Sequence, residues 1–373
     1  MTRRRVGWNK AIEMAKIRDT QTYHDGHQDG LKPVRAIDIN EINSFSEMLR
    51  AYQNASFGAR RVGDALDVME AMANDPDCFV VCTLAGAMTV AKMGLVLCEM
   101  IERGYIDMII STGALQAHGM IEGSGMDHFK YESGMNDVEL FNKGYDRVYD
   151  TLELERNLDE LELLVRSILD KVEGGVPLGS KDICKILGRE LSERFENQRG
   201  ILKSAYENDV PVIIPAFTDS ELGLDVMVHN LARKRKGREP LAFDPFQDLG
   251  FYADAVKDRD HLGIFTIGGG VPRNWAQQIG PYLEIMHHRL GDEGGHTQRF
   301  RYGVRICPEP ENWGGLSGCS YSEGMSWGKF VPVAEGGRYA EVPVDATVVW
   351  PILIKALTEV VPKKTKNFAP AKP

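Results

Sequence analysis

The 373-residue sequence lacks several motifs that would assign it quickly to a class of enzyme. It has no Gly-x-x-x-x-Gly-Lys-Ser/Thr phosphate loop and no Gly-x-Ser-x-Gly turn, which argues against P-loop nucleotide hydrolases and against α/β-hydrolases. It has no Cys-x-x-Cys pair, and its histidines, including His118 and His128, show no recognised metal-ligand spacing. The sequence therefore predicts no metal site.

A long uninterrupted apolar run is also missing. The most hydrophobic stretch, Phe79 to Met100, contains Lys92 and Glu99, so we expect a buried strand and a core helix rather than a membrane span. No apolar run follows the basic start MTRRRVGWNK, so no signal peptide is expected. Four of the six cysteines lie in apolar, strand-like or helix-like contexts typical of reduced thiols, which predicts a cytoplasmic location.

An excess of basic residues is absent as well. The 44 Lys and Arg residues are outnumbered by 54 Asp and Glu residues, which gives a net charge of −10. Such a chain lacks the broad positive field that phosphate backbones require, so nucleic acid is not an expected partner and small cationic ligands fit the charge better. The 43% of hydrophobic residues is sufficient for a large globular core.

Short apolar runs alternate with helical patterns along the chain. The runs begin near positions 78, 105, 210, 261 and 301, with a last one at Val342 to Val344, and they are unbroken rather than alternating. Helices are expected from Met88 to Glu102, within 156–206 and from Thr347 to Glu359. Such a pattern predicts a mostly parallel sheet with helices on both faces. We therefore expect an α/β fold with an N-terminal extension at residues 1–35 and one large domain at 36–373.

Ligands of such sheets bind where the strands end, so the residues that follow each run matter most. The turn Ile267-Gly268-Gly269-Gly270 precedes a helix and is either a phosphate cradle or a plain tight turn. Thr112 and Gly113 end another run, where their hydroxyl and backbone either hold a ribose or phosphate or cap a helix. Asp345, followed by Ala346, is a helix cap or a ribose ligand, or both.

A long aperiodic segment after Cys307 ends in Ser322-Glu323-Gly324-Met325-Ser326-Trp327-Gly328-Lys329. Long loops of this kind in compact domains are usually functional. A single lysine is ordinarily a solvated surface group, whereas a lysine that loses solvent beside Trp327 has a lowered pKa and becomes a nucleophile toward imines and carbonyls. Both interpretations of Lys329 are open at this point.

Four stretches together resemble the deoxyhypusine synthase family, including its bacterial homologues: IPAFTDSELG, FTIGGGVPRN, SEGMSWGK and PVDATVVWP. Weaker similarity extends over nearly the whole chain from about Val34. The resemblance implies a Rossmann-like NAD-binding fold and a homotetramer with sites at dimer interfaces. It also implies an NAD-dependent transfer of an aminobutyl group from a polyamine such as spermidine, without net redox change.

The resemblance assigns roles to individual residues. Lys329 matches the family's catalytic lysine, which carries the aminobutyl group as an imine, while Trp327 and Glu323 match contacts of the polyamine. The predicted cofactor-binding residues are Thr112, Gly113, Asp219, Gly269, Gly270, Asp345 and Ala346. Positions that contact the amine in eukaryotic members are occupied here by His118, Asp225 and Asn274, which we predict to bind substrate.

This chain departs from the eukaryotic pattern at several of these positions. Ala117 and His118 stand where those members have an acidic pair, Leu224 precedes Asp225 where they have an aspartate, and Asn274 replaces a histidine. Leu316 stands where those members have an acid two residues beyond the loop glycine, and the cofactor-contacting positions are occupied by Pro308, Glu309 and Trp313. The sequence thus supports covalent chemistry at Lys329 more strongly than it supports spermidine as the amine donor. It gives still less support to a protein lysine as the acceptor.

Three functions are consistent with these residues. The leading one is an aminoalkyl transferase acting between small amines, for example in homospermidine synthesis with putrescine as the acceptor. The second is a sirtuin-like transferase that cleaves NAD, although the zinc-binding cysteines and catalytic histidine usual in that class are not evident. The third is an NAD- or polyamine-binding homologue without catalysis.

Overall fold

The computed structural model describes residues 20–291 and 298–364 and is built around a six-stranded sheet. The predictions for residues 1–19 of the extension lie outside these ranges. The strand order is β11-β10-β9-β1-β2-β7, and every neighbouring pair is parallel. The strands are β1 (Cys78–Leu84), β2 (Met108–Ser111), β7 (Val212–Ile213), β9 (His261–Ile267), β10 (Phe300–Ile306) and β11 (Arg338–Val342). The parallel α/β sheet predicted from the apolar runs is confirmed.

The chain runs outward from the middle of the sheet in both directions. From β1 it proceeds through β2 to β7, and from β9 through β10 to β11, so the strand order reverses between β1 and β9. All seven residues of β1 are buried, which explains why its sequence CFVVCTL is continuously apolar apart from one threonine. That Thr83 donates its hydroxyl hydrogen bond to Thr266 on β9, so the buried polar atom is satisfied.

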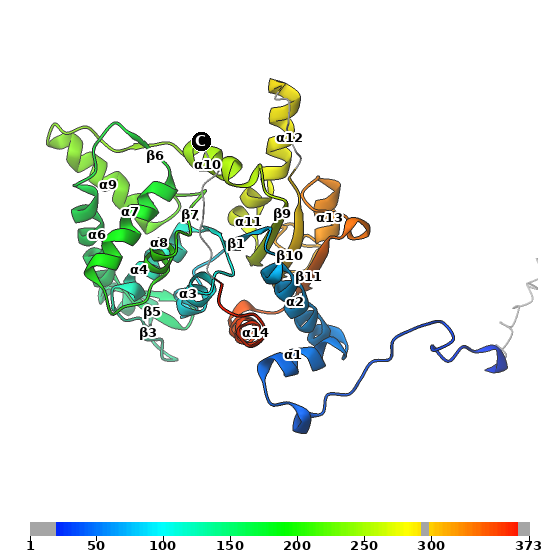
Figure 1. Cartoon of the computed structure of the whole chain (residues 1–373). Helices are drawn as coiled ribbons and strands as arrows, with labels where there is room; N and C mark the ends of the chain where they lie inside the picture. The colour runs from blue at the N-terminus through cyan, green and yellow to red at the C-terminus, as the bar shows by residue number, and fades with distance from the viewer. Residues whose placement is uncertain (1–19, 292–297, 365–373) are drawn as a thin grey trace, which may run out of the picture.

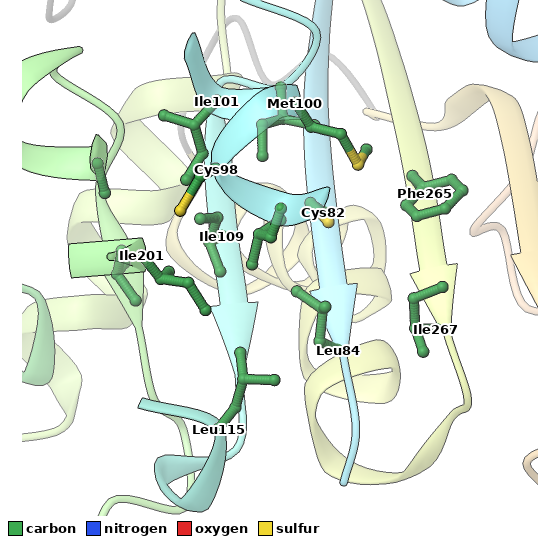
Figure 2. Close-up of a cluster of buried hydrophobic side chains, with 14 of the residues drawn as sticks. Cys82, Leu84, Cys98, Met100, Ile101, Ile109, Leu115, Ile201, Phe265 and Ile267 are labelled. Carbon is green, nitrogen blue, oxygen red and sulfur yellow. The ribbon is translucent and has the colours of Figure 1, made fainter. Parts of the chain in front are cut away.

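Helices pack on both faces of this sheet, in two apolar clusters. The larger cluster joins one face to α2 (Phe57–Asn74), α3 (Gly94–Glu102), α4 (Gly113–Gly123) and α14 (Ala346–Val360). In Figure 2, Cys82 and Leu84 of β1 lie between Phe265 of β9 and side chains of α3 such as Cys98. The smaller cluster joins the opposite face to α10 (Phe246–Val256), α11 (Gly270–Gln277), α12 (Ile279–Leu290) and α13 (Tyr321–Ser326).

A group of further helices lies beside the β2–β7 side of the sheet, on the left in Figure 1. It contains α6 (Glu155–Leu169), α7 (Ser180–Arg194), α8 (Ile201–Glu207) and α9 (Glu221–Arg235), which confirms the helices expected within 156–206. Two small sheets, which the sequence did not suggest, accompany them. One is antiparallel and has the strand order β3 (Phe129–Lys130), β5 (Thr151–Leu154), β4 (Tyr145–Val148). The helix α5 (Asp137–Asn142) lies between β3 and β4 in the chain. The other small sheet pairs β6 (Pro177–Leu178) with β8 (Ala242–Phe243).

Three predicted boundaries are wrong. The helix expected from Met88 starts at Gly94, because Lys92 adopts a left-handed backbone with φ of 61° that an α-helix does not accommodate. The strand expected at Val342–Val344 ends at Val342, one residue before a proline. The segment around Glu323, expected to be a loop, contains the short helix α13, capped by the Ser320 hydroxyl, which accepts from the Glu323 amide.

The described part of the N-terminal segment extends away from the rest of the molecule before α1 (Phe45–Gln53) begins (Figure 1). Its side chains are mostly exposed, and it forms two short 3-10 helices, Thr20–Thr22 and Ile39–Glu41; a third, Val333–Glu335, precedes β11. All six cysteines lie in the described ranges and are free thiols. Among the described helices, none combines the length and the apolarity needed to cross a bilayer.

Candidate active site

The predicted cofactor residues gather where the parallel strands end, around the loop that follows β1. The Thr112 hydroxyl donates a 2.6 Å hydrogen bond to the Gly86 carbonyl in this loop. On the other side, the Ala85 amide donates to the Ile267 carbonyl at the end of β9. The loop thus lies at the point where the strand order reverses, the usual ligand position in such sheets.

Thr112 and Gly113 begin α4, and Asp219 lies beside them. Thr112 is the N-cap of α4, and its hydroxyl accepts from the Leu115 amide. A side chain at Gly113 is excluded, because a Cβ there would lie 2.2 Å from the Ser220 hydroxyl, next in sequence to Asp219. Thr112 and Gly113 thus lie at the end of β2, and the segment that carries Asp219 after β7 packs against Gly113.

The triple-glycine turn connects β9 to α11. Gly268 and Gly270 have positive φ angles of 73° and 61°, a conformation that favours glycine. A Cβ at Gly269 would lie 2.7 Å from the Ser317 backbone, so the turn packs closely against the long loop after β10. No atom lies within 4 Å of a Cβ built at Gly270, so a ligand can approach the backbone at the start of α11.

Asp345 is the N-cap of α14 and accepts from the Thr347 amide at 2.9 Å. The cap that the sequence suggested is confirmed, and Ala346 is the first, buried residue of the helix. The carboxylate remains exposed and lines a groove of about 950 Å³ together with Thr347 and with Ala87 and Met88 from the loop after β1. It is therefore accessible to a ligand in this groove.

Lys329 lies at the end of the segment that follows α13, beside the first residue of β10. Its carbonyl accepts from the Phe300 amide, which fixes the backbone. Its ammonium donates a 3.1 Å hydrogen bond to Oδ1 of Asn274 on α11 and lies 6.0 Å from the centre of the Trp327 ring. The structure thus joins Lys329 to two other predicted substrate residues.

The surroundings of Lys329 favour its neutral amine. Burial lowers the pKa of Lys329 below its ordinary value, and the nearby guanidinium of Arg273 lowers it further, while Cys319 and Glu323 act in the opposite direction. Arg273 is itself buried on α11, where it donates to the carbonyls of Ser317 and Cys319. Trp327 is 67% exposed, so one wall of the lysine site is open to a ligand.

His118 and Asp225 form a separate group, away from Lys329. Glu221 lies near both of them, with its Oε1 4.0 Å from Nε2 of His118. Burial raises the pKa of Asp225 to about 6, and the charges of Glu162 and Glu221 act in the same direction. α9, which carries Asp225, and α13, which precedes Lys329, lie on opposite sides of the molecule in Figure 1. A single chain therefore does not unite all the predicted amine contacts.

Sequence reasoning missed several residues of this second group. Glu153 on β5 accepts from His118 at 3.2 Å and lies 2.5 Å from Nε2 of His128. Burial disfavours its charge, but the contacts with His118, His128 and Asn157 outweigh burial and lower the pKa of Glu153 to about 2. No periodic pattern marks Glu153, because it comes from the unpredicted antiparallel sheet. Arg273 was also missed, although it lies within the quoted FTIGGGVPRN stretch.

The parallel sheet, the glycine turn at its strand ends and the half-buried lysine define an α/β protein with a candidate ligand site beside a lysine. A sequence model of the family "DS: Deoxyhypusine synthase" matches residues 47–357. "Probable deoxyhypusine synthase 2" of Methanosarcina acetivorans is 32% identical over 328 residues, covering 88% of this chain and 90% of that protein. The chain therefore belongs to the deoxyhypusine synthase family.

Other relatives agree with this membership. A "Deoxyhypusine synthase-like protein" of Chlorobaculum tepidum is 30% identical over 323 residues, which cover 86% of this chain and 88% of that protein. The solved structure of an Entamoeba histolytica protein described as a deoxyhypusine synthase superposes with a TM-score of 0.57 at 13% identity. It covers 89% of this chain and 99% of that chain, and it supports the fold.

Proposed function

We propose that this protein is an NAD-dependent aminoalkyl transferase that carries the transferred group on Lys329. The observation on which the proposal rests is the environment of the Lys329 amine, half-buried between Asn274 and Trp327 with a lowered pKa. An amine must be unprotonated to attack an imine carbon, and an exposed lysine at neutral pH is almost entirely protonated. Family membership supplies the class of reaction.

NAD fits the carboxyl edge of the sheet. The strand order, numbered along the chain, is 3-2-1-4-5-6 from β7 to β11, the order of doubly wound dinucleotide-binding sheets. The open space at Gly270 admits a phosphate to the start of α11, and Asp345 offers a carboxylate to ribose hydroxyls. The bound nicotinamide would accept a hydride from the donor amine and later return it.

The chain's own residues would then carry the transfer. Nζ of Lys329 attacks the imine carbon derived from the donor, forms the enzyme imine, and the leaving amine departs with the proton. Oδ1 of Asn274 holds Nζ in place. The Trp327 face and the Glu323 carboxylate contact the alkyl chain and the ammonium end of the polyamine. An acceptor amine then displaces Lys329, which regenerates the free lysine.

We propose small amines as both donor and acceptor, with homospermidine formed on putrescine as the concrete example. In this chain, His118, Asn274 and Leu224 replace residues that contact the amine in eukaryotic members. Such a change in the amine shell supports a change of substrate more than it supports modification of a protein lysine. NAD cleavage, as in a sirtuin-like transferase, would instead be recognised by release of nicotinamide.

The separation of Asp225 from Lys329 supports assembly into a homotetramer whose sites combine residues of two copies. On α9, Leu224, Met227, Val228 and Leu231 follow helical spacing and are 62%, 55%, 56% and 44% exposed. An apolar stripe of this kind is typical of a surface that another chain covers. We propose a second copy as that chain, and we retain residues 1–35 as an extension of a domain at 36–373.

Trapping of the enzyme imine tests the proposal. The protein is incubated with NAD, spermidine or putrescine, and sodium cyanoborohydride, and intact mass and peptide mass are measured. We expect an aminobutyl adduct on Lys329 that depends on NAD and is absent in Lys329→Ala. Lys355→Ala, which removes an exposed lysine on α14, should retain the adduct.

Two outcomes would overturn the proposal. One is turnover of amines by Lys329→Ala at the wild-type rate, which removes the covalent step. The other is tight NAD binding without adduct or product across a panel of di- and triamines, which identifies a homologue without catalysis.

A further inference from the structure

Three side chains far apart in the sequence converge on one point beside α4. They are His118 on α4, His128 in the segment after α4, and Glu153 on β5. One potential ligand atom from each lies within 4.8 Å of the other two. The side chains of His128 and Glu153 are each 1% exposed, and that of His118 is 9% exposed. The group is therefore buried and drawn from three separate segments.

The two imidazoles approach the same carboxylate oxygen. Nδ1 of His118 lies 3.2 Å and Nε2 of His128 lies 2.5 Å from Oε2 of Glu153. Nε2 of His128 is buried, and its short contact with this carboxylate does not have hydrogen-bond geometry. Ligands at 2.0–2.1 Å from a tetrahedral zinc ion are about 3.3 Å apart, so small side-chain adjustments would place an ion between the three atoms.

The outer partners of the imidazoles fit this arrangement in part. A histidine that binds a metal usually donates its other N–H to a carboxylate, and Nε2 of His118 faces Oε1 of Glu221 at 4.0 Å. The second oxygen of Glu221 is buried and has no partner among the described residues. Glu221 therefore lies on the far side of the His118 ring from the proposed ion, where it can orient the imidazole.

The ammonium of Lys92 opposes metal binding. This ammonium lies 2.9 Å from Nδ1 of His128. This contact requires Nδ1 to accept a hydrogen bond, so Nδ1 carries no proton in this arrangement. The lysine side chain is 45% exposed and lies 4.0 Å from Oε1 of Glu122. It can therefore turn to Glu122 when His128 takes up the Nδ1–H tautomer that metal binding at Nε2 requires.

We propose that His118, His128 and Glu153 form a binding site for one borderline divalent cation of the zinc class. Two imidazoles and one carboxylate are a donor set that selects zinc or iron(II) over magnesium and calcium, which prefer oxygen ligands alone. The ion would tie the three-stranded sheet to α4 and release to solvent the protons it displaces. His118 would then serve as a ligand at a position where the family resemblance predicts an amine contact.

Metal content of the full-length protein tests the site. The protein is stripped with a chelator, the chelator is removed, one equivalent of zinc chloride is added, and bound zinc is counted after gel filtration. We expect one zinc per chain, with affinity lowered at least tenfold in His128→Gln and in Glu153→Gln. Lys92→Gln should bind zinc at least as tightly, because the amide oxygen can accept from Nδ1–H of His128.

A measurement of cobalt(II) binding by the wild-type protein needs no variant, so it tests the site even if a substituted protein fails to fold. Wild-type protein loaded with cobalt should show the visible absorption of a four- or five-coordinate site, and zinc should displace it. Retention of zinc by His128→Gln and Glu153→Gln, or its loss in His288→Gln on α12, would overturn the proposal. So would a wild-type protein that binds neither zinc nor cobalt, which would leave the group as a hydrogen-bonded His–Glu network. Lys329→Ala should bind zinc normally, so this result is separate from the transferase proposal.

Discussion

The Lys329 ammonium and the Asn274 amide oxygen lie 3.1 Å apart, although 55 residues separate them in the sequence. This hydrogen bond connects the loop-borne lysine to the helix that begins at the triple-glycine turn. Any ligand held at the start of α11 is thereby positioned relative to the reactive amine. The pair therefore links the predicted cofactor-binding edge of the sheet directly to the proposed catalytic lysine.

The charge at position 274 should set the pH at which Lys329 becomes reactive. In Asn274→Asp the added carboxylate favours the ammonium, so the acid limb of the pH–rate profile should move upward by about one pH unit. In Asn274→Leu the hydrogen bond to the ammonium is lost, so the limb should stay or move downward. The measurement is the rate of adduct formation between pH 6 and 10. Equal shifts in both variants would contradict a direct contact between the two side chains.

Gly269→Ala should disrupt the packing of the turn between β9 and α11 against the loop after β10. The new methyl group would lie 2.7 Å from the Ser317 backbone, which cannot move away as freely as a side chain. We expect a loss of about 1–3 kcal/mol in the free energy of unfolding, together with weaker NAD binding. Gly314→Ala in the same loop meets no atom within 4 Å and is the matched control. Denaturant unfolding and NAD titration measure both effects.

Asp225 should make the stability of the protein depend on pH. Burial and neighbouring carboxylates raise its pKa from 3.8 to about 6, so the folded state binds the proton more tightly than the unfolded state. Its contribution is favourable at low pH and is lost as the pH rises from about 4 to 6. Asp225→Asn should therefore raise the melting temperature by about 2 °C at pH 8 and leave it unchanged near pH 4.

Thermal unfolding at the two pH values measures this difference. Asp159→Asn, an exposed aspartate on α6, is the control and should change neither value. A stabilisation by Asp225→Asn that is equal at both pH values would show that ionisation of Asp225 is not its cause.

The α9 stripe should hold copies of the chain together. Val228→Lys places a charge in the middle of the apolar stripe, and a buried unpaired charge is costly at an interface. We expect the proposed tetramer to dissociate to smaller species in sedimentation velocity, with little change in helix content by circular dichroism. Leu290→Lys on α12 replaces an exposed leucine outside the stripe and should leave assembly unchanged. A wild-type monomer would remove the proposal altogether.

The amino-acid sequence by itself determined the parallel sheet and the approximate positions of most of its strands. Short, continuous apolar runs such as CFVVCTL are typical of strands that are covered on both faces. Helix caps such as Thr112 and Asp345 are local features that a short stretch specifies. The stretch SEGMSWGK drew attention to Lys329, and the resemblance of four stretches to one family gave that lysine its predicted role. These features depend on neighbours in the chain, so they can be read without coordinates.

Only the tertiary structure decided which side chains meet. The lowered pKa of Lys329 depends first on burial and then on Arg273 of a different element. The convergence of His118, His128 and Glu153 depends on a small antiparallel sheet with weak periodicity. The structure also placed Asp225 away from Lys329, where the sequence had grouped them. Burial and contacts between distant segments arise from packing, and local sequence patterns carry little information about packing partners.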